Sequence, residues 1–416
     1  MARVEAYAGQ RLRIEQVDGR VEYYPHGPKI EMPAVTWTDG EPWLAATVYL
    51  RRKAFQAAAS GGSQTTITQH AAALSAYATY LESENLDWRV FPEDRSLRPT
   101  YRYRGHVLAR CSAKDLARST AANHMSVLRA FYAWAMHSGA LIDQSIQPFR
   151  PRQIMVRYAD QMGLERSTTV TSSDLAIKRP KVARRGVEEG CMPLRRVDRD
   201  QLLQICRDYF RVEFQLLMKL GFFSGMRLGT IVGLTHTAIR HHFPSPDLTG
   251  WYAISVGPEH GIPTKKDVTY HPSMPEPLLR ELLEYSQSVR RAVRQRNASK
   301  VDQDLIFLNV RGRRLTIRSF SADMTRLRRI AKAQGMRIPR FHFHCTRPTF
   351  GTAFVLASLA RGHKTNQILP RLMRLLGHAT AASSMHYIDW VEDEARMEAD
   401  SDAYDDFLGL PEVATT

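Results

Sequence analysis

The chain lacks the patterns of a secreted or membrane protein. Its cysteines are scattered and form no CxxC pair, which fits reduced thiols rather than a disulfide framework; they are Cys111, Cys191, Cys206 and Cys345. No run of about 18 apolar residues occurs, so no membrane span is expected. The N-terminus, MARVEAYAGQRLRIEQ, lacks the apolar core of a signal peptide. We therefore expect a cytoplasmic protein that makes no membrane contact.

Internal repeats and low-complexity tracts are also absent, which leaves ordinary globular domains. At 416 residues the chain is too long for one ordinary core, so we expect two or three domains.

Before the C-terminal tail, acidic residues are far fewer than basic ones. The net charge is +16, yet from Asp389 onward there are ten acidic residues and one basic residue. A basic body with an acidic tail indicates a polyanionic partner, most simply a nucleic acid. Arginine outnumbers lysine 47 to 11. That ratio fits phosphate gripping by forked guanidinium groups, and it fits equally well the codon bias of a GC-rich genome.

Five ranges differ in pattern. Residues 1–60 form an N-terminal extension with a β-hairpin expected around Asp18-Gly19 and a short helix over 43–55. This extension is either an extra DNA-contacting module or an elaboration that packs on the next domain. The segment 57–63, AAASGGS, looks like a flexible joint. Residues 64–146 read as a helical bundle, because apolar residues recur at helical spacing, as in Ile67, Ala71, Leu74, Ala78 and Leu81.

Residues 150–195 read as a linker with weak apolar periodicity and a basic run, IKRPKVARRG. Residues 196–390 alternate helices with short strands, expected at 251–256, 267–272 and in DLIFLN, and further helices are expected at 275–296 and 319–334. The fold class is therefore mainly α with a small β-sheet, in an α+β order. Residues 391–416 form the acidic C-terminal tail.

The stretch 341–390 carries an unusual set of polar side chains. His344 and Arg347 lie three residues apart, Leu376-Gly377-His378 follows, and Tyr387 comes nine residues after His378. An arginine can hold a phosphate as a planar fork, histidines can donate hydrogen bonds or protons, and a tyrosine hydroxyl can attack. Each residue alone could be a surface charge or a packed core residue. Together they indicate chemistry on a phosphate.

The spacing of His378 and Tyr387 also predicts a structural feature. Nine residues in an unbroken helix would span about 13.5 Å, too far for both side chains to reach one phosphate. We therefore expect a break near Gly377, with Tyr387 on a separate short helix that can move.

The order HxxR, LGH and Tyr resembles the signature of the tyrosine recombinase (phage integrase) family. The family's first arginine follows a buried helix, and FFSGMRLGTIVGL matches it with Arg227. The family's lysine lies in a hairpin turn, and PTKKDVTYHP offers Lys265 or Lys266; we take Lys265, which follows threonine as in the common form. The resemblance implies a catalytic set of Arg227, Lys265, His344, Arg347, His378 and the nucleophile Tyr387. It covers 196–390 well and 64–146 loosely.

The resemblance implies a metal- and ATP-independent enzyme that cleaves and rejoins DNA through a 3′-phosphotyrosyl intermediate, with no cofactor and no metal site. It implies a C-shaped DNA clamp built from a helical core-binding domain and an α+β catalytic domain. The partner would be double-stranded DNA with a specific attachment site. A homotetramer would act on two such sites, from a monomer or dimer without DNA. The task would be integration, excision or transposition of a mobile element, at the bacterial nucleoid.

The stretch STAANHMSVLRAFYAWAMHSGALIDQSIQPF resembles the end of the family's core-binding domain, which clamps one face of the duplex. Basic residues there and in the linker and turn are candidate DNA contacts, although any one could be a solvated surface charge. They are Arg102, Arg104, Arg110, Lys114, Arg118, Arg129, Lys178, Arg179, Lys181 and Lys266. The acidic tail is either a disordered solubilising segment or a segment that docks on a neighbouring subunit through Phe407, Leu408 and Leu410.

Two residues depart from the family pattern: Thr230 stands where an acidic residue is frequent, and Pro348 follows Arg347. Two other functions compete with recombination. A type IB topoisomerase would use the same chemistry to relax supercoils as a monomer, and a DNA-binding regulator would keep a degenerate site. A metal site from His342, His344, Cys345 and His378 is conceivable, but the first three are too crowded for the usual ligand spacing.

Overall fold

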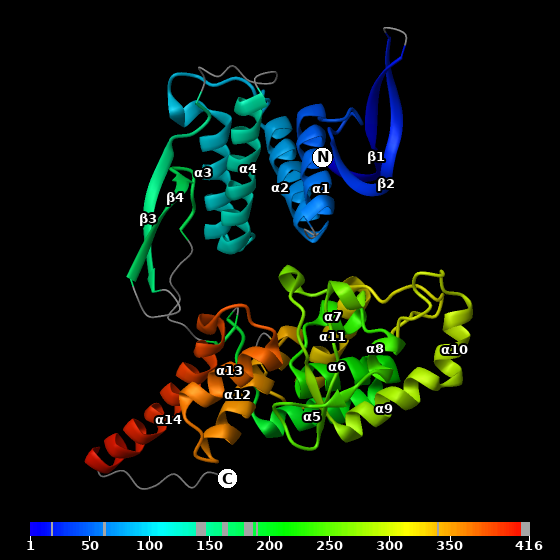
Figure 1. Ribbon diagram of the computed structural model, residues 1–416. Coiled ribbons are helices and arrows are strands. Elements are labelled where there is room, and N and C mark those ends of the chain that lie inside the picture. Colours follow the sequence, from blue (N-terminus) through cyan, green and yellow to red (C-terminus); the bar gives the residue numbers. More distant parts are fainter. Residues whose placement is uncertain are drawn as a thin grey trace. The chain divides into compact units, whose positions relative to one another are not determined.

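A computed structural model describes residues 1–17, 20–60, 64–138, 147–159, 165–178, 186–188, 190–338 and 341–408. The chain folds as two compact units, Met1–Lys181 and Val182–Thr416 (Figure 1). Each unit has its own buried apolar core. Within the described ranges, no helix is long and apolar enough to cross a membrane.

The first unit begins with a long antiparallel hairpin, as the alternating sequence predicted. Strand β1 (Arg3–Val17) pairs with β2 (Arg20–Thr36), and the Asp18-Gly19 turn lies outside the described residues. Helix α1 (Leu44–Ser60) follows and is longer than expected. The alanine-rich start of the predicted flexible joint is helical, because alanine is the strongest helix former. Residues 61–63 of that joint are outside the described ranges.

Helices complete the core of the first unit: α2 (Gln64–Ser83), α3 (Pro99–Ser112) and α4 (Arg118–Ser138), with a 3-10 turn at Arg95–Leu97. The predicted apolar stripe of α2 is buried. Trp43, which precedes α1, packs its ring 5.3 Å from that of Phe131 in α4 and 6.2 Å from that of Tyr77 in α2. The N-terminal extension therefore shares one core with the helices.

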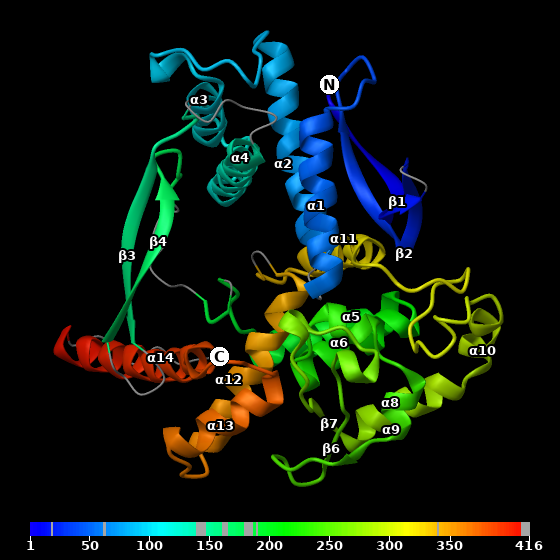
Figure 2. The same cartoon turned by 45° about the horizontal axis from the view of Figure 1, so that its top comes forward.

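The expectation of an irregular linker is wrong over 151–173. Strand β3 (Pro151–Ala159) pairs with β4 (Glu165–Ser173) in an antiparallel hairpin (Figures 1 and 2). The segment ERSTTVTSS is rich in β-branched threonine and valine, which favour strands. It has no alternation of apolar and polar residues, so periodicity gave no sign of it. Most of the basic run 177–186 lies outside the described residues.

The second unit surrounds a small antiparallel sheet, in the order β5-β6-β7, with helices. The strands are β5 (Phe243–Pro244), β6 (Trp251–Ala253) and β7 (Ser273–Pro275). The helices up to the functional stretch are α5 (Arg196–Tyr209), α6 (Val212–Ser224), α7 (Leu228–Val232), α8 (His236–Arg240), α9 (Glu276–Gln287), α10 (Val289–Arg296) and α11 (Ile317–Ala333). The predicted fold class, mainly α with a small sheet, is confirmed.

Three element predictions need correction. The strand expected at 267–272 is displaced to β7, because Lys266 and Asp267 have positive φ angles of 62° and 54°, which extended backbone excludes. DLIFLN forms only isolated bridges, one of which joins Leu308 to Arg314. The helix expected over 275–296 divides at Ser288, whose hydroxyl accepts from the Arg291 amide and caps α10.

The end of the chain forms three helices packed on one another: α12 (Thr346–Leu359), α13 (Thr365–Leu376) and α14 (Ala381–Leu408) (Figure 2). Pro348 lies in the first turn of α12, where its missing N–H removes no helical hydrogen bond. The backbone of the predicted acidic tail is helical as far as Leu408, and residues 409–416 lie outside the described ranges.

Candidate active site

Five of the six predicted catalytic side chains meet in the second unit around one carboxylate, that of Glu188. The shortest distances to Glu188 oxygens are 2.5 Å from the Tyr387 hydroxyl, 2.8 Å from Arg347, 3.0 Å from Arg227, 3.5 Å from His344 and 3.8 Å from His378. These residues come from five different segments. The fold therefore assembles a site from parts that the sequence separates by up to 160 positions.

Arg347 is the most rigidly held member of this cluster. Its side chain is 1% exposed and makes three hydrogen bonds: Nη1 donates to Gly225 O at 2.9 Å, Nη2 to Leu376 O at 2.7 Å and Nε to Glu188 Oε2 at 2.8 Å. The two carbonyls lie at the C-terminal ends of α6 and α13, where helices leave carbonyls unpaired and carry partial negative charge. Two helix ends thus orient the guanidinium before any substrate arrives.

Arg227 approaches the same carboxylate from the start of α7. Its Nη2 lies 3.0 Å from Glu188 Oε1. Its Nε is buried and has no hydrogen-bond partner among the described residues. A buried donor without an acceptor costs free energy, so this N–H is suited to an additional anion oxygen. Thr230, the departure from the family pattern, is buried and donates to Pro263 O at 3.0 Å.

His378 is positioned by a residue that the sequence did not suggest. Its Nδ1 lies 2.7 Å from the hydroxyl of Ser384 in α14, and its Nε2 faces Glu188. Burial lowers the pKa of His378, and the arginines add to this effect, whereas the contact with Glu188 opposes it. The neutral ring then accepts or donates one hydrogen bond at each nitrogen.

For the DNA strand cleavage that the family resemblance implies, replacing Ser384 with alanine is expected to lower the rate about tenfold, because the His378 ring loses the contact that fixes its orientation. A Ser384→Thr variant keeps the hydroxyl and should recover most of that rate. Single-turnover cleavage with saturating DNA measures the effect. If DNA affinity falls while the cleavage rate is unchanged, Ser384 does not position His378.

The predicted break before Tyr387 is confirmed. Helix α13 ends at Leu376, Gly377 adopts the left-handed conformation at φ 61°, and α14 begins at Ala381. The helix that carries Tyr387 is not short, however, because it continues for 28 residues. A Cβ on Gly351 of α12 would lie 2.3 Å from the Tyr387 ring, so only glycine lets the ring pack there.

Tyr387 is fully buried, and its hydroxyl donates to Glu188 Oε2. Burial raises the pKa of Tyr387 well above its usual value, and the Glu188 charge adds to this, although Arg347 opposes it. The tyrosine hydroxyl therefore stays protonated in this arrangement. Removal of the carboxylate would leave the arginines as its nearest charges and lower that pKa.

Glu188 was absent from the predicted set. Burial alone would raise the pKa of its carboxyl, but hydrogen bonds from His344 and His378 and the charge of Arg347 hold that pKa far below its ordinary value. An ionised carboxylate therefore sits among two arginines, two histidines and a tyrosine. The one sequence signal was the acidic pair of VEEG directly after a basic run.

The two candidate lysines line a cavity next to this cluster. The cavity has a volume of about 320 Å³, and Arg227, His378 and Glu188 line it together with Lys265 and Lys266. Both lysines are exposed, on a 3-10 turn between β6 and β7. The structure places both at the mouth of the site, and the choice of Lys265 stays a prediction.

The predicted DNA-contacting residues of the first unit lie on or beside α3 and α4. Arg110, Lys114 and Arg118 are exposed. Arg102 pairs with Glu84 at 2.5 Å, Arg129 donates to Thr171 O at 3.4 Å, and Arg104 is half-buried. Of the linker residues, Lys178 is exposed, whereas Arg179 and Lys181 lie outside the described ranges.

Two family profiles match the sequence. The profile of the "Phage integrase family" matches residues 194–393, which include all the residues of the cluster except Glu188. The profile "Phage integrase, N-terminal SAM-like domain" matches residues 55–139, which correspond to the end of α1 and helices α2 to α4. Together the two profiles cover more than half of the chain.

Several solved structures are similar to the chain. XerH site-specific recombinase bound to difH substrate is 19% identical, with a TM-score of 0.48 and coverage of 80% of each chain. Tn1549 transposon integrase in complex with circular intermediate DNA is 16% identical, with a TM-score of 0.47 and coverage of 81% of this chain and 94% of that one. A lambda integrase dimer bound to a COC′ core site is 15% identical, with a TM-score of 0.43, covering 82% and 94%. No curated protein matches the sequence.

Proposed function

Because the chain belongs to the phage integrase family, whose members cleave and rejoin DNA strands as site-specific recombinases, we propose that the side chains around Glu188 are its catalytic set. One observation carries this proposal: five side chains of the right types already bind a single anion, the Glu188 carboxylate. A carboxylate presents two oxygens in a plane, as does one face of a phosphodiester. The scissile phosphate of DNA would take its place.

The two arginines would stabilise the transition state. Arg347 and Arg227 would each donate to non-bridging oxygens of the phosphate, where negative charge accumulates as the nucleophile attacks. Arg347 needs no reorganisation, because helix-end carbonyls already fix its guanidinium. The free Nε of Arg227 gives the second oxygen a donor that Glu188 leaves unused.

Tyr387 would supply the nucleophile. Its hydroxyl oxygen forms a bond to phosphorus while the bond from phosphorus to the 5′-oxygen breaks, leaving a 3′-phosphotyrosyl link and a free 5′-hydroxyl. His344 would take the tyrosine proton, His378 would donate a hydrogen bond to the phosphate, and Lys265 would protonate the leaving oxygen. Attack by the 5′-hydroxyl of another strand reverses the step and needs neither ATP nor another cofactor.

Glu188 must leave before this chemistry can start. Its carboxylate occupies the position of the phosphate, and two anions in one pocket repel each other. The turn that carries Glu188 lies near the start of the second unit, and in the sequence it directly follows the basic run 177–186. DNA binding would therefore displace the carboxylate and free the tyrosine hydroxyl in the same event.

The test of this function uses the full chain and nicked duplexes that carry sequences flanking its own gene. A covalent protein–DNA band on denaturing gels is the expected result, since a nick lets the cut strand diffuse away and traps the phosphotyrosyl link. A chain that binds such DNA tightly but forms no band on any of these sequences would instead be a regulator with a degenerate site.

Two variants and a modified substrate can show which of Lys265 and Lys266 protonates the leaving oxygen. Lys265→Ala is expected to slow cleavage about 10²- to 10³-fold, because the leaving 5′-oxygen loses its proton donor. A substrate with sulfur in place of that oxygen needs no proton and should restore most of the rate. Lys266→Ala is the matched control and should retain cleavage of the ordinary substrate. If Lys266→Ala shows the sulfur-rescued defect instead, the two roles are exchanged.

We also propose the wider assembly. The helices within 64–146 would form the DNA-binding core domain, with Arg110, Lys114 and Arg118 as its most accessible phosphate contacts, and residues 196–390 the catalytic domain. A homotetramer would act on two duplexes, with the end of α14 contacting a neighbouring subunit. Such an enzyme would work in the cytoplasm of a bacterial cell, at the nucleoid.

A further inference from the structure

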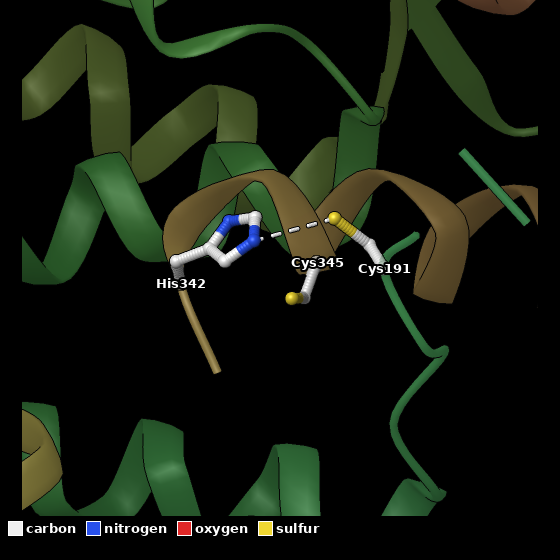
Figure 3. A group of neighbouring side chains, drawn as sticks. All are labelled: Cys191, His342 and Cys345. Atoms are coloured by element: carbon white, nitrogen blue, oxygen red, sulfur yellow. Dashed lines mark hydrogen bonds between the residues drawn. The ribbon is translucent and has the colours of Figure 1, made fainter. Parts of the chain in front are cut away.

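A second cluster of reactive side chains lies beside the catalytic set. Cys191, His342 and Cys345 come together in the second unit, with the His342 ring directed at the Cys191 sulfur (Figure 3). Their ligand atoms all lie within 4.8 Å of one another. The proposed strand cleavage uses none of the three, so the cluster has no role yet.

The separation of the Cys191 and His342 ligand atoms fits a shared metal ion. The Cys191 sulfur lies 3.5 Å from His342 Nε2. Zinc bound tetrahedrally to a thiolate at about 2.3 Å and an imidazole nitrogen at about 2.0 Å separates these two atoms by roughly 3.5 Å. Two thiolates also neutralise a divalent cation, and soft sulfur ligands favour zinc over magnesium or calcium.

The local backbone explains how His342 and Cys345, three residues apart, can bind the same ion. His342 and Cys345 bracket a 3-10 turn, closed by a hydrogen bond of 2.9 Å from the Cys345 amide to the His342 carbonyl. Residues three apart lie on the same side of such a turn. His344 therefore points elsewhere, toward Glu188. The crowding that counted against a site of His342, His344 and Cys345 disappears once Cys191 replaces His344.

The burial of the three residues suggests how an ion would reach them. Cys191 and Cys345 are 3% and 5% exposed, whereas His342 is exposed. A cation held by these three atoms would thus be enclosed on its sulfur side and accessible on its histidine side. That geometry leaves room for water as a fourth ligand and gives the ion a path of entry.

We propose that Cys191, His342 and Cys345 form a binding site for a thiophilic divalent cation, with zinc the best fit. The site would be structural for this enzyme. The Cys191 amide donates to the Glu188 carbonyl at 2.9 Å, and the Cys191 carbonyl accepts from the Val187 amide at 2.9 Å. Cys345 is two residues from Arg347. The ion would therefore join the turn that carries Glu188 to the start of the helix that carries Arg347.

The test begins with the full chain, purified under reducing conditions and stripped of metal. Addition of cobalt(II) should give one equivalent bound per chain, with the thiolate charge-transfer bands and the strong visible bands of a tetrahedral site. Zinc should displace the cobalt and raise the melting temperature, because it binds only the folded state. Both metals are added as simple salts, without DNA or any other ligand.

Variants assign the ligands. Cys191→Ala and Cys345→Ala should each lower cobalt affinity at least about a hundredfold and remove the zinc-dependent rise in melting temperature. His342→Ala changes an exposed side chain, so it should remain folded and still lose at least tenfold in affinity. Cys206→Ala is the matched control, since Cys206 is a buried thiol of the same unit outside the cluster and should bind metal as the wild type does.

Three results would overturn the proposal. The first is wild-type chain that takes up no cobalt. The second is uptake that Cys191→Ala and His342→Ala leave unchanged, which would mean adventitious binding elsewhere. The third is a disulfide between Cys191 and Cys345 in protein isolated with its thiols protected from air, which would make the pair a redox couple rather than a ligand set.

Discussion

Replacing Tyr387 with phenylalanine is expected to abolish the covalent protein–DNA adduct, a loss of at least about 10³-fold in strand cleavage. The variant lacks the oxygen that must bond to phosphorus, and no other group in the cluster can replace it. Because the ring stays packed against Gly351, the variant should fold. Loss of the hydrogen bond to the charged Glu188 carboxylate should lower the free energy of unfolding by about 1.5 to 3 kcal/mol. DNA affinity should be preserved. Denaturing gels and a binding titration measure the two effects.

Tyr270 offers the matched control for this experiment. It is a second buried tyrosine of the same unit, packed against Gly377. Tyr270→Phe should still form the adduct. An adduct that survives Tyr387→Phe and is lost in Tyr270→Phe would show that the nucleophile has been assigned to the wrong tyrosine.

Removing the Glu188 carboxylate should have two opposite effects. Glu188→Ala leaves the buried Arg347 without its anionic partner, and breaking such a pair costs about 3 kcal/mol of unfolding free energy. The same change removes the occupant that competes with the phosphate, so DNA should bind about tenfold more tightly at low salt. Chemical denaturation measures the loss of stability, and a binding titration measures the gain in DNA affinity.

Sulfate or inorganic phosphate gives a sharper form of this test. Either anion should stabilise Glu188→Ala strongly and the wild type hardly at all, because only the variant has an empty anion pocket. Glu281→Ala serves as the control, since it removes one acidic charge from a half-buried pair with Lys219 in the same unit. If Glu281→Ala tightens DNA binding as much as Glu188→Ala does, the tighter binding comes from the loss of one negative charge alone. Glu188 then does not compete with the phosphate for the pocket.

Local patterns in the sequence were enough to find five of the side chains that meet around Glu188. Arg227 follows a buried helix and a glycine turn, and His344, Arg347, His378 and Tyr387 occupy short motifs that keep their spacing in the fold. The helix break at Gly377 followed from the reach of two side chains to one phosphate. The sequence context favoured Lys265 over Lys266, and this choice stays a prediction because both lysines line the cavity from one short turn.

Two contacts that were missed join residues far apart in the sequence. Glu188 contacts Arg347 across 159 positions, and Cys191 contacts His342 across 151. No periodicity or motif encodes contacts at such separation, because the backbone path between the partners decides them. The hairpin β3–β4 was missed for a related reason, since its strands lack the alternation that marks a half-buried sheet.

The length of α14 has a mechanical consequence. The helix runs without interruption from Ala381 to Leu408, so its backbone joins Tyr387 to a point some 30 Å away. Because a continuous helix is stiff, a tilt of one end also moves the other end. A contact made at the acidic end of this helix would therefore shift Tyr387, and with the proposed function it would control when the hydroxyl reaches the phosphate.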